Sequence, residues 1–355
     1  QVEHPVTELV TGVDLVDWQL RIAAGEALPM AQEELALDGH AIEVRIYAED
    51  PARGFIPQTG RLGIFEAAEG AGVRIDHGVE SGLTVSPFYD SMLAKLITWG
   101  RDREEARRRL VRALSQTTAL GLTTNKTFLI QLLSETDFVD GAATTAFIDD
   151  ALLERTSADT STADVALAAV VLDRSNTALA NWSNSEHMVT RERLRAGDGE
   201  HDVVFQHNAD GYSVTVGEDE YQIDVNAFGD DAIIYTLDGV ARSARWLLQG
   251  EVLGLDVGPR AVHYERLTYA PARSADAAGS GRIAATTEGL VTDVLVAAGD
   301  SVTKGQTLVV VEAMKMEHRH VADGDGTVAA VSAEKGQQVK LRQLLVELTL
   351  EEEAS

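Results

Sequence analysis

The C-terminal part of the chain contains an internal repeat, and this repeat restricts the fold more than any other feature. In its first half Gly289 is followed by Gly299, Val302 and Leu308, and the same four residue types recur 37 positions later. Apolar and polar side chains alternate in both halves, as is typical of half-buried strands, and glycines mark the turns. The duplication predicts two matching halves that face each other in a flattened β-barrel or sandwich.

One lysine lies between the two halves of the repeat. Lys315 stands between two methionines, in a chain that has only six lysines. A hairpin that joins the halves would hold this side chain at an exposed tip, which suits a lysine that is covalently modified. The alternative is an ordinary surface lysine on a hairpin, as most lysines are.

The residues around Lys315 carry a resemblance. Residues 312–316 read Glu-Ala-Met-Lys-Met, which resembles the biotin attachment motif of biotin carboxyl carrier domains. The resemblance implies that a biotin protein ligase joins biotin covalently to Lys315. A lipoyl domain has the same architecture, but methionines on both sides favour biotin. Carrier domains usually have a Pro-Met-Pro-Gly segment upstream, and here only its glycine, Gly289, is retained.

The composition argues against several classes of function. The length of 355 residues predicts two or three domains, and 45% hydrophobic residues can form cores. A net charge of -27 repels phosphate backbones, which argues against nucleic acid as a partner. The lack of cysteine excludes disulfides, and no apolar run is long enough to cross a membrane. We expect a cytoplasmic protein, or one of the mitochondrial matrix in a eukaryote.

Residues 1–155 predict a mixed α/β domain. Residues 41–47 alternate in polarity and indicate a strand, and Asp102 begins a helix in a capping-box pattern. A second helix is expected over 124–133. The polar segment of small residues that begins at Thr156 suggests a domain boundary.

Residues 156–269 predict a helix, expected over 164–172, followed by an all-β domain. Short β runs recur after this helix at 202–206, 212–216, 221–225, 232–237, 241–248, 252–257 and 262–267. Many short strands at near-regular spacing are typical of a barrel or sandwich. Residues 270–281 predict a flexible linker, and residues 282–350 hold the repeat.

The first residues of the chain carry a second resemblance. Gln1-Val2-Glu3-His4-Pro5 resembles a catalytic segment of biotin carboxylases, which are ATP-grasp enzymes. The resemblance implies that Gln1 and Val2 help to hold bicarbonate and that Glu3 is the general base that deprotonates it. A carboxylate beside an anion site can have a raised pKa, as a base requires. Without the motif, Glu3 would be an ordinary solvated charge.

Residues 41–51 resemble another segment of the same family. The resemblance implies that Arg45 stabilises the biotin enolate and contacts bicarbonate. A guanidinium is always charged and presents a fork of donors, which suits a developing oxyanion. The alternative is a simple ion pair between Arg45 and Glu43 on one face of a strand.

Three further positions match the family. Residues 88–96 imply that Asp90 lies near the route of biotin, and residues 120–125 imply that Leu122 packs near adenine. Packing at the start of a helix is the alternative for Leu122. Arg74 matches a position at the carboxylase dimer interface, with a surface salt bridge as an equal alternative.

The segments that would hold ATP are not found. No glycine-rich loop is followed by lysine, and the family's magnesium-binding carboxylates, which precede Gln1, are missing. ATP and Mg2+ are therefore implied only for the full-length subunit, and no metal site is expected within this chain. The start at Gln1 without methionine suggests a fragment, which we expect not to cleave ATP alone.

The order of these parts resembles the α subunit of an acyl-CoA carboxylase. It comprises the C-terminal lobe of an ATP-grasp biotin carboxylase, a helix with an antiparallel β-barrel, and a biotinyl carrier domain. The resemblance implies a hetero-oligomer in which residues 156–269 dock onto a separate carboxyltransferase β subunit. Trp182 and Met188 favour a 3-methylcrotonyl-CoA carboxylase over a propionyl-CoA or geranyl-CoA carboxylase, although both could be core residues. A carrier and scaffold without catalysis is the alternative from another class.

Overall fold

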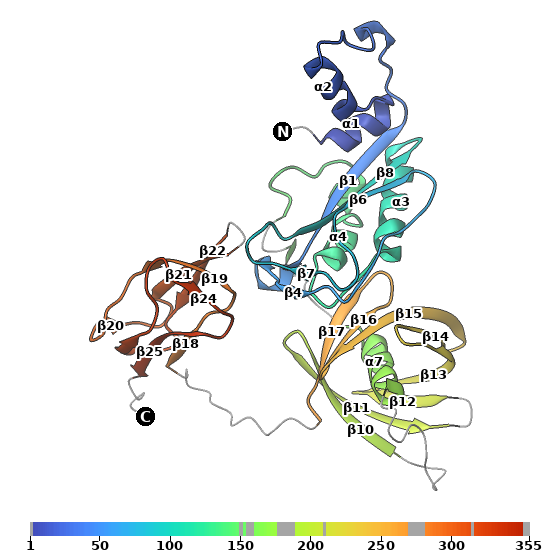
Figure 1. Ribbon diagram of the computed structural model, residues 1–355. Coiled ribbons are helices and arrows are strands. Elements are labelled where there is room, and N and C mark those ends of the chain that lie inside the picture. The colour runs from blue at the N-terminus through green and yellow to red at the C-terminus, as the bar shows by residue number, and fades with distance from the viewer. Residues whose placement is uncertain are drawn as a thin grey trace. The chain divides into compact units, whose positions relative to one another are not determined.

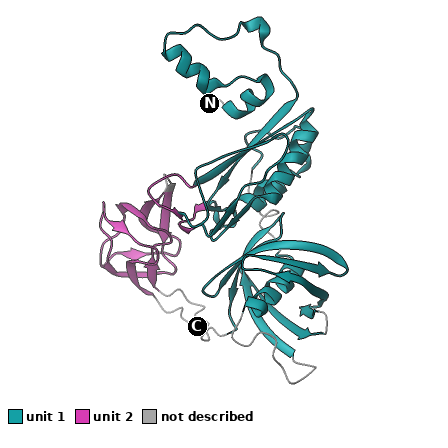
Figure 2. Ribbon diagram, turned by 45° about the vertical axis from the view of Figure 1, so that its right-hand side comes forward, with its two compact units in different colours: residues 1–55, 62–83, 92–270 teal, residues 56–61, 84–91, 271–355 magenta. Residues whose placement is uncertain are grey.

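The computed structural model describes residues 3–148, 152–153, 160–175, 189–208, 211–268, 281–313 and 316–350. The chain divides into two compact units, which Figure 2 colours separately. Unit 1 comprises residues 1–55, 62–83 and 92–270, and unit 2 comprises residues 56–61, 84–91 and 271–355. Unit 1 holds an α/β region and a β-barrel, and unit 2 holds a β-sandwich (Figure 1).

A three-stranded antiparallel sheet forms the centre of the α/β region. Its strands lie in the order β1 (His40–Tyr47), β8 (Met92–Gly100) and β6 (Val73–His77). One face carries apolar side chains such as Leu96 and packs against helix α3 (Arg103–Gln116). On this face the Thr98 hydroxyl donates a hydrogen bond to the Ala106 carbonyl of α3 at 2.8 Å. The opposite face of the sheet is left for charged side chains.

Helix α3 begins where the capping pattern predicted. The Asp102 carboxylate accepts a hydrogen bond from the Glu105 N–H at 2.8 Å, which satisfies an amide that lacks a partner within the helix. Ala106, Leu110 and Leu114 lie on its buried face. The predicted start of this helix and the predicted strand over 41–47 are confirmed.

The other elements before the barrel are short. They are α1 (His4–Thr11), α2 (Leu15–Ala23), η1 (Gln32–Glu34), β2 (Glu49–Asp50), η2 (Pro51–Arg53), β3 (Ile56–Pro57), β4 (Gly60–Arg61), β5 (Ile64–Glu66), β7 (Thr84–Val85), β9 (Thr118–Leu120), α4 (Lys126–Leu132) and α5 (Thr136–Val139). Helix α4 confirms the predicted second helix and begins two residues later than expected.

Eight antiparallel strands form the closed barrel of unit 1. They are β10 (Val189–Ala196), β11 (Gly199–His207), β12 (Tyr212–Val216), β13 (Asp219–Phe228), β14 (Ala232–Leu237), β15 (Val240–Gln249), β16 (Val252–Asp256) and β17 (Ala261–Arg266). Pairing of β10 with β17 closes the barrel. Helix α7 (Thr162–Ser175) shares one apolar core with the inner faces of these strands, because its side chains from Val165 to Leu172 are all buried (Figure 1).

The seven predicted β runs all fall on barrel strands, from β11 to β17. The eighth strand, β10, was not predicted, because four of its eight side chains are charged. Only Glu192, Leu194 and Ala196 of this strand are buried, so its apolar signal is weak. The observed closure decides for a barrel over a sandwich in this part of the chain. Residues 270–280 of the predicted linker lie outside the described residues.

The C-terminal domain consists of two four-stranded sheets. One has the order β18 (Arg282–Ala284), β25 (Leu344–Leu350), β23 (Gly326–Val331) and β20 (Ser301–Val302). The other has the order β22 (Met316–Val321), β21 (Thr307–Ala313), β19 (Gly289–Val294) and β24 (Gln338–Val339). The 37-residue shift relates the strands of the two sheets in the same order, which confirms the predicted sandwich of two matching halves.

The two halves exchange equivalent backbone hydrogen bonds. The Gly299 N–H donates to the Val328 carbonyl at 2.8 Å, and the Gly336 N–H donates to the Val291 carbonyl at 2.8 Å. Both glycines have a positive φ, +94° and +86°, which residues with a Cβ rarely adopt. The turn glycines of the repeat are therefore required by the backbone conformation.

The strand glycines of the repeat serve close packing instead. A Cβ at Gly289 would lie 2.4 Å from the Glu312 carbonyl oxygen, and one at Gly326 would lie 2.3 Å from the Thr349 carbonyl oxygen. These two contacts are also related by the 37-residue shift. Glycine at both positions allows the backbones of two strands to approach closely.

Candidate active site

The second face of the three-stranded sheet carries the candidate site. Glu43 and Arg45 project from β1, Lys95 from β8, and Arg74 and Asp76 from β6. The register places Arg45 opposite Lys95 and Lys95 opposite Asp76. Because side chains two residues apart on a strand share a face, these five residues form one surface, here called the charged face.

Arg45 binds Glu3, which precedes helix α1. Arg45 Nη2 donates to Glu3 Oε1 at 3.0 Å and to Glu3 Oε2 at 3.1 Å. Pro5 lies in the first turn of α1, where its missing N–H has no helical partner to lose. The start of α1 thus brings together the two residues that the resemblance to biotin carboxylases singled out.

Glu43 is the buried member of the charged face. Its side chain is only 4% exposed, and its Oε1 lies 3.6 Å from Arg45 Nε and 3.5 Å from Lys95 Nζ. The Arg45–Glu43 pair that was considered as an alternative therefore exists beside the Arg45–Glu3 pair. One guanidinium serves both carboxyl groups, because it has donors on three nitrogens.

The pKa values of the two carboxyl groups move in opposite directions. Burial, and then the neighbouring Glu3 carboxyl group, raises the pKa of Glu43. The neighbouring Glu43 carboxyl group lowers the pKa of Glu3, and the charge of Arg45 lowers it further against the effect of partial burial. A raised pKa was expected for Glu3 from the sequence. That expectation was wrong for this arrangement, because the neighbouring Glu43 carboxyl group and Arg45 both favour the ionised form of Glu3.

Arg74 is engaged within the chain at the other edge of the charged face. Arg74 Nη1 lies 2.6 Å from Glu8 Oε2 of helix α1, and Arg74 Nη2 lies 2.8 Å from Asp76 Oδ2. The hydrogen bond from Arg74 is the main reason why the pKa of Asp76 is lowered. The salt-bridge alternative for Arg74 is therefore confirmed, and its place at a dimer interface stays a prediction.

Asn125 fixes the backbone of β1 beside Arg45, and sequence reasoning missed this role. Its side-chain oxygen accepts from the Tyr47 N–H at 2.9 Å, and its amide nitrogen donates to the Arg45 carbonyl at 3.1 Å. The only signal in the sequence was an asparagine near the start of a predicted helix. Lys95 was also missed, because its position opposite Arg45 depends on the register of two distant strands.

The other predicted residues divide into two groups. Leu122 is buried between β9 and α4, as packing at the start of a helix would require, and its contact with adenine stays a prediction. Asp90 is exposed and belongs to unit 2, and its place on a biotin route also stays a prediction. The remaining predicted residues lie outside the described residues: Gln1, Val2, Trp182, Met188 and Lys315.

The strands on both sides of Lys315 are described. Ala313 of β21 pairs with Met316 of β22, so only Met314 and Lys315 connect the two strands. A two-residue connection is the commonest link between paired antiparallel strands. Lys315 itself lies outside the described residues, and its role as the attachment site stays a prediction.

The segment that departs from the Pro-Met-Pro-Gly pattern makes a hydrogen bond with strand β22. Thr286 occupies the first proline position, and its N–H donates to His320 Nε2 at 3.0 Å. A proline at that position would have no N–H to satisfy. Both His318 and His320 are buried, and burial lowers the pKa of each. A neutral histidine therefore supplies the acceptor that the unusual segment requires.

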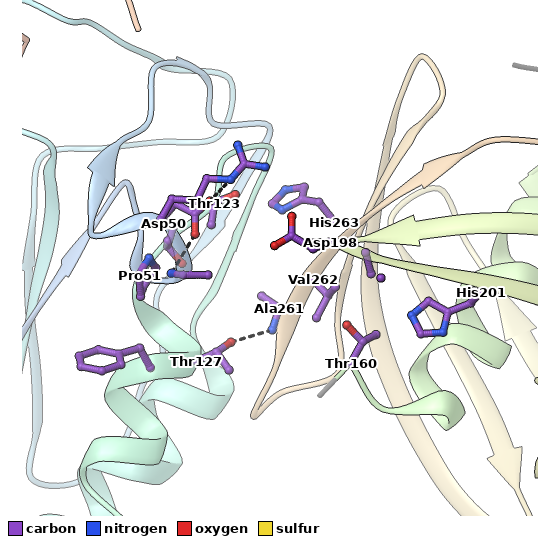
Figure 3. A pocket seen from close by; sticks show the side chains of 17 residues that line it. Asp50, Pro51, Thr123, Thr127, Thr160, Asp198, His201, Ala261, Val262 and His263 are labelled. Carbon is purple, nitrogen blue, oxygen red and sulfur yellow. Dashed lines mark hydrogen bonds and ion pairs between the residues drawn. The ribbon is translucent and has the colours of Figure 1, made fainter. Parts of the chain in front are cut away.

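A cavity of about 550 Å³ lies in unit 1 between the α/β region and the barrel (Figure 3). The Ala261 N–H of β17 donates to Thr127 Oγ1 of α4 at 3.2 Å and joins its two sides. The charged lining includes both signs, with Asp50 and Asp198 against Arg53. This lining selects no single class of ligand, and the charged face does not contribute to it.

Three family models match the chain. Residues 43–150 match the biotin carboxylase C-terminal domain, residues 280–348 match the biotin-requiring enzyme domain, and residues 1–31 match the ATP-binding domain of the carbamoyl-phosphate synthase L chain. The chain contains a biotin carboxylase C-terminal domain and a biotin-requiring enzyme domain. The charged face thus belongs to a biotin carboxylase lobe, and the duplicated sandwich is a biotinyl domain.

The chain is similar to several carboxylases, to some over nearly its whole length and to others over less than half of it. It is 35% identical to the mouse "Methylcrotonoyl-CoA carboxylase subunit alpha, mitochondrial", over 99% of this chain and 53% of that protein. It is 53% identical to a biotin carboxylase of Halalkalibacterium halodurans, over 44% of this chain and 34% of that protein. The solved biotin carboxylase domain of a thermophilic 2-oxoglutarate carboxylase is 41% identical, covers 45% of this chain and 36% of its own, and has a TM-score of 0.43. The chain spans about half the length of the first curated relatives that it matches.

No group of three or more metal-binding side chains comes together among the described residues. None of the described helices is both long enough and apolar enough to cross a membrane.

Proposed function

We propose that this chain is part of an acyl-CoA carboxylase α subunit, an ATP- and bicarbonate-dependent enzyme whose biotin is held covalently on Lys315. We propose its parts as residues 1–155 of the biotin carboxylase, 156–269 for subunit docking, 270–281 as linker and 282–350 as carrier. When bound, biotin supplies a ring nitrogen that accepts a carboxyl group at one site and releases it at another.

The Glu3–Arg45 ion pair is the observation that carries this proposal. An ionised carboxylate at this position can accept the proton of bicarbonate, because Arg45 keeps a positive charge beside the anion that forms. Gln1 and Val2 precede Glu3 and would complete the bicarbonate site with Arg45. Asn125 would keep Arg45 in place through the backbone of β1.

Two further residues would contact the other substrates. Asp90 would lie along the route by which biotin reaches the carboxylase site, and Leu122 would pack against adenine. ATP and Mg2+ would be held by the full-length subunit, whose curated relatives are about twice as long as this chain. No residue of this chain is assigned to the metal.

The names of the relatives support a partner and a substrate. A "subunit alpha" implies a second subunit, which we propose to be a carboxyltransferase β subunit docked through residues 156–269. Among acyl-CoA substrates, 3-methylcrotonyl-CoA is favoured by the names of these relatives, with propionyl-CoA and geranyl-CoA as alternatives. A biotin protein ligase would load Lys315. The expected compartment is the cytoplasm, or the mitochondrial matrix in a eukaryote.

The carrier assignment can be tested by labelling. The chain is co-expressed with a biotin protein ligase, and attached biotin is detected by avidin blotting and by intact mass. We expect Lys315→Arg to lose the label and Lys335→Arg, an exposed lysine of the same domain, to retain it. Equal labelling of both variants would contradict the assignment, and a lipoyl mass shift on Lys315 would indicate the wrong cofactor.

The carboxylase assignment needs a separate measurement. In the complete carboxylase, Arg45→Lys should lower kcat for bicarbonate-dependent ATP cleavage by about 10²-fold, because one ammonium cannot replace a fork of donors. Arg193→Lys, on an exposed face of the barrel, is the matched control and should leave the rate unchanged. An unchanged rate for Arg45→Lys would remove Arg45 from the site.

A further inference from the structure

We propose that Glu43 holds a proton between its own carboxyl group and that of Glu3, and thereby positions the base of the carboxylation reaction. The positioning role rests on the proposed function of Glu3. The shared proton itself rests only on the geometry of the charged face, so the two parts can be tested separately.

The hydrogen-bond inventory around Glu43 is the first reason. Both of its carboxyl oxygens are shielded from solvent, and no donor of the described residues is in hydrogen-bonding geometry with either of them. The nearest cationic nitrogens, Arg45 Nε and Lys95 Nζ, lie 3.6 and 3.5 Å from Oε1, which exceeds a normal N–H···O distance. A buried acceptor without a donor destabilises a fold by about 1–3 kcal/mol.

The neighbour that remains for Glu43 is another acceptor. Glu3 and Glu43 lie against the same guanidinium, because Arg45 Nη2 is 3.0 Å from Glu3 Oε1 and Arg45 Nε is 3.6 Å from Glu43 Oε1. Two carboxylates cannot hydrogen-bond to each other, because neither has a donor. A single proton removes this conflict, since a neutral Glu43 donates to an ionised Glu3, which also accepts from Arg45.

The balance of charge is the second reason. The carboxyl groups on and beside the charged face are Glu3, Glu8, Glu43 and Asp76, and the permanent cations are Arg45, Arg74 and Lys95. Four acids against three cations leave one negative charge, which one proton neutralises. His4 adds charge only when it is protonated.

Burial decides which carboxyl group takes this proton. The side chain of Glu43 is 4% exposed, whereas that of Glu3 is 42% exposed and stays close to water. Desolvation penalises the ionised form of the more buried group. The opposite pKa shifts of the two residues, upward for Glu43 and downward for Glu3, agree with this assignment.

This arrangement has a consequence for the base. Glu3 is held ionised and oriented by two donors, one from Glu43 and one from Arg45, before any substrate arrives. The proton that leaves bicarbonate can then bind an oxygen of Glu3 while the proton on Glu43 stays where it is. Glu43 acts on the reaction through Glu3 and is therefore a positioning residue.

The shared proton can be measured in the 355-residue chain without catalysis. The chain is labelled with δ-¹³C glutamate, and the carboxyl signals of Glu3 and Glu43 are assigned by their loss in Glu3→Gln and Glu43→Gln. We expect the Glu43 signal to titrate above the ordinary glutamate pKa of about 4.3 and the Glu3 signal below it. In Glu43→Leu the titration of Glu3 should move upward by about one pH unit. The Glu8→Gln variant, which changes the same surface at Arg74, should leave it in place.

Two results would overturn the shared proton. They are a Glu43 signal that titrates at or below the ordinary value, and a Glu3 titration that does not respond to Glu43→Leu in a folded chain. Amide spectra establish that the variant is folded. Glu43→Gln, which has nearly the shape of the parent side chain and keeps a donor, should leave the Glu3 titration near its parent position. If the leucine variant unfolds, the titration of Glu43 in the parent chain decides the question.

The positioning role is tested in the complete carboxylase by the pH profile of kcat/KM for bicarbonate. Glu43→Leu should shift its acidic limb and lower kcat/KM by about tenfold, and Glu43→Gln should restore much of the loss. An acidic limb that does not move in Glu43→Leu would overturn the positioning role. Full activity of Glu3→Gln would instead remove the proposed function of Glu3 while leaving the shared proton intact.

Discussion

Unit 1 buries charge in two places and treats it differently. At the junction of lobe and barrel, Lys126 of α4 is 0% exposed and lies 2.7 Å from Asp256 of β16. Lys126 Nζ also donates to the Thr117 carbonyl at 2.8 Å, and the Gly258 N–H donates to Asp256 Oδ1 at 2.8 Å. On the charged face, the side chain of Glu43 is only 4% exposed but lies 3.5 Å or more from its cations.

The difference separates an ion pair whose hydrogen bonds are complete from one whose hydrogen bonds are not. Every oxygen of the Asp256 carboxylate has a donor, and the pair joins segments 130 residues apart in the sequence. Such a pair is satisfied in one geometry and has no spare capacity for a ligand. Glu43 has acceptor capacity that its own cations do not fill, and this capacity lies beside the candidate base. Completeness of hydrogen bonding distinguishes the two sites.

The largest effect is expected from breaking the complete pair. Lys126→Met should lower the free energy of unfolding of unit 1 by about 3–5 kcal/mol, because it leaves Asp256 buried without its cation. Urea denaturation followed by tryptophan fluorescence measures this loss. The double variant Lys126→Met with Asp256→Leu should recover most of it, since apolar side chains can replace a buried pair. A Lys126→Met variant that is as stable as the parent would show that the Lys126–Asp256 pair does not stabilise unit 1.

A smaller effect on stability is expected in the biotinyl domain, where two buried histidines stay neutral. Burial holds the pKa of His318 and His320 below their usual value. Below about pH 6.5 both histidines bind a proton in the unfolded chain, whereas in the folded domain they stay neutral. The free energy of unfolding therefore has its full value above that pH and decreases as the pH falls below it. The loss is about 1.4 kcal/mol for each pKa unit of depression per histidine.

Hydrogen exchange of the β21 and β22 amides at pH 7.5 and pH 5, corrected for the intrinsic exchange rate, measures this decline. His318→Leu should reduce this decline, because it removes one of the two groups that bind a proton on unfolding. The change breaks no hydrogen bond of His318 Nε2, since this atom has no hydrogen-bond partner among the described residues. Protection that is equal at both pH values would show that the histidines are charged in the folded domain or accessible to water.

The smallest effect is expected from an exposed ion pair. Arg193 and Asp202 lie 2.7 Å apart on neighbouring barrel strands, with side chains 55% and 72% exposed. Arg193→Met should change the free energy of unfolding by less than about 1 kcal/mol, since water screens such pairs. The same urea titration used for Lys126→Met gives a direct ratio. If Arg193→Met and Lys126→Met lose similar free energies of unfolding, the distance between the two charged groups determines the loss. Burial and complete hydrogen bonding of the pair would then have no effect.

The parts of this fold that the sequence predicted are those in which local pattern and structure coincide. The repeat was visible because Gly299 and Gly336 occupy a backbone conformation that favours glycine. Seven barrel strands were visible because each turns one apolar face to a common core. Strand β10 was not, because its charged outer side chains conceal its three buried ones.

The candidate site shows the opposite case. Family resemblance singled out Glu3 and Arg45 one at a time, but their contact spans 42 residues and depends on where α1 packs. Asn125 and Lys95 reach Arg45 through strand register and a distant loop, which no local pattern specifies. Glu43 was seen only as a competitor for Arg45. Its proposed part in the site rests on the lack of a donor, among the described residues, for either of its carboxyl oxygens.

The duplicated sandwich also determines how far its cofactor arm can reach. The 37-residue shift relates Ala313, the last residue of β21, to Leu350, the last residue of β25. In Figure 1 strand β22 begins at one end of the domain, and β25 finishes at the other. The chain that tethers the domain and the lysine that would carry biotin are thus attached at opposite poles. A biotin carried on Lys315, as proposed, would therefore be held at the far end of a folded domain, which extends its reach without the loss of entropy that a longer unfolded segment would require.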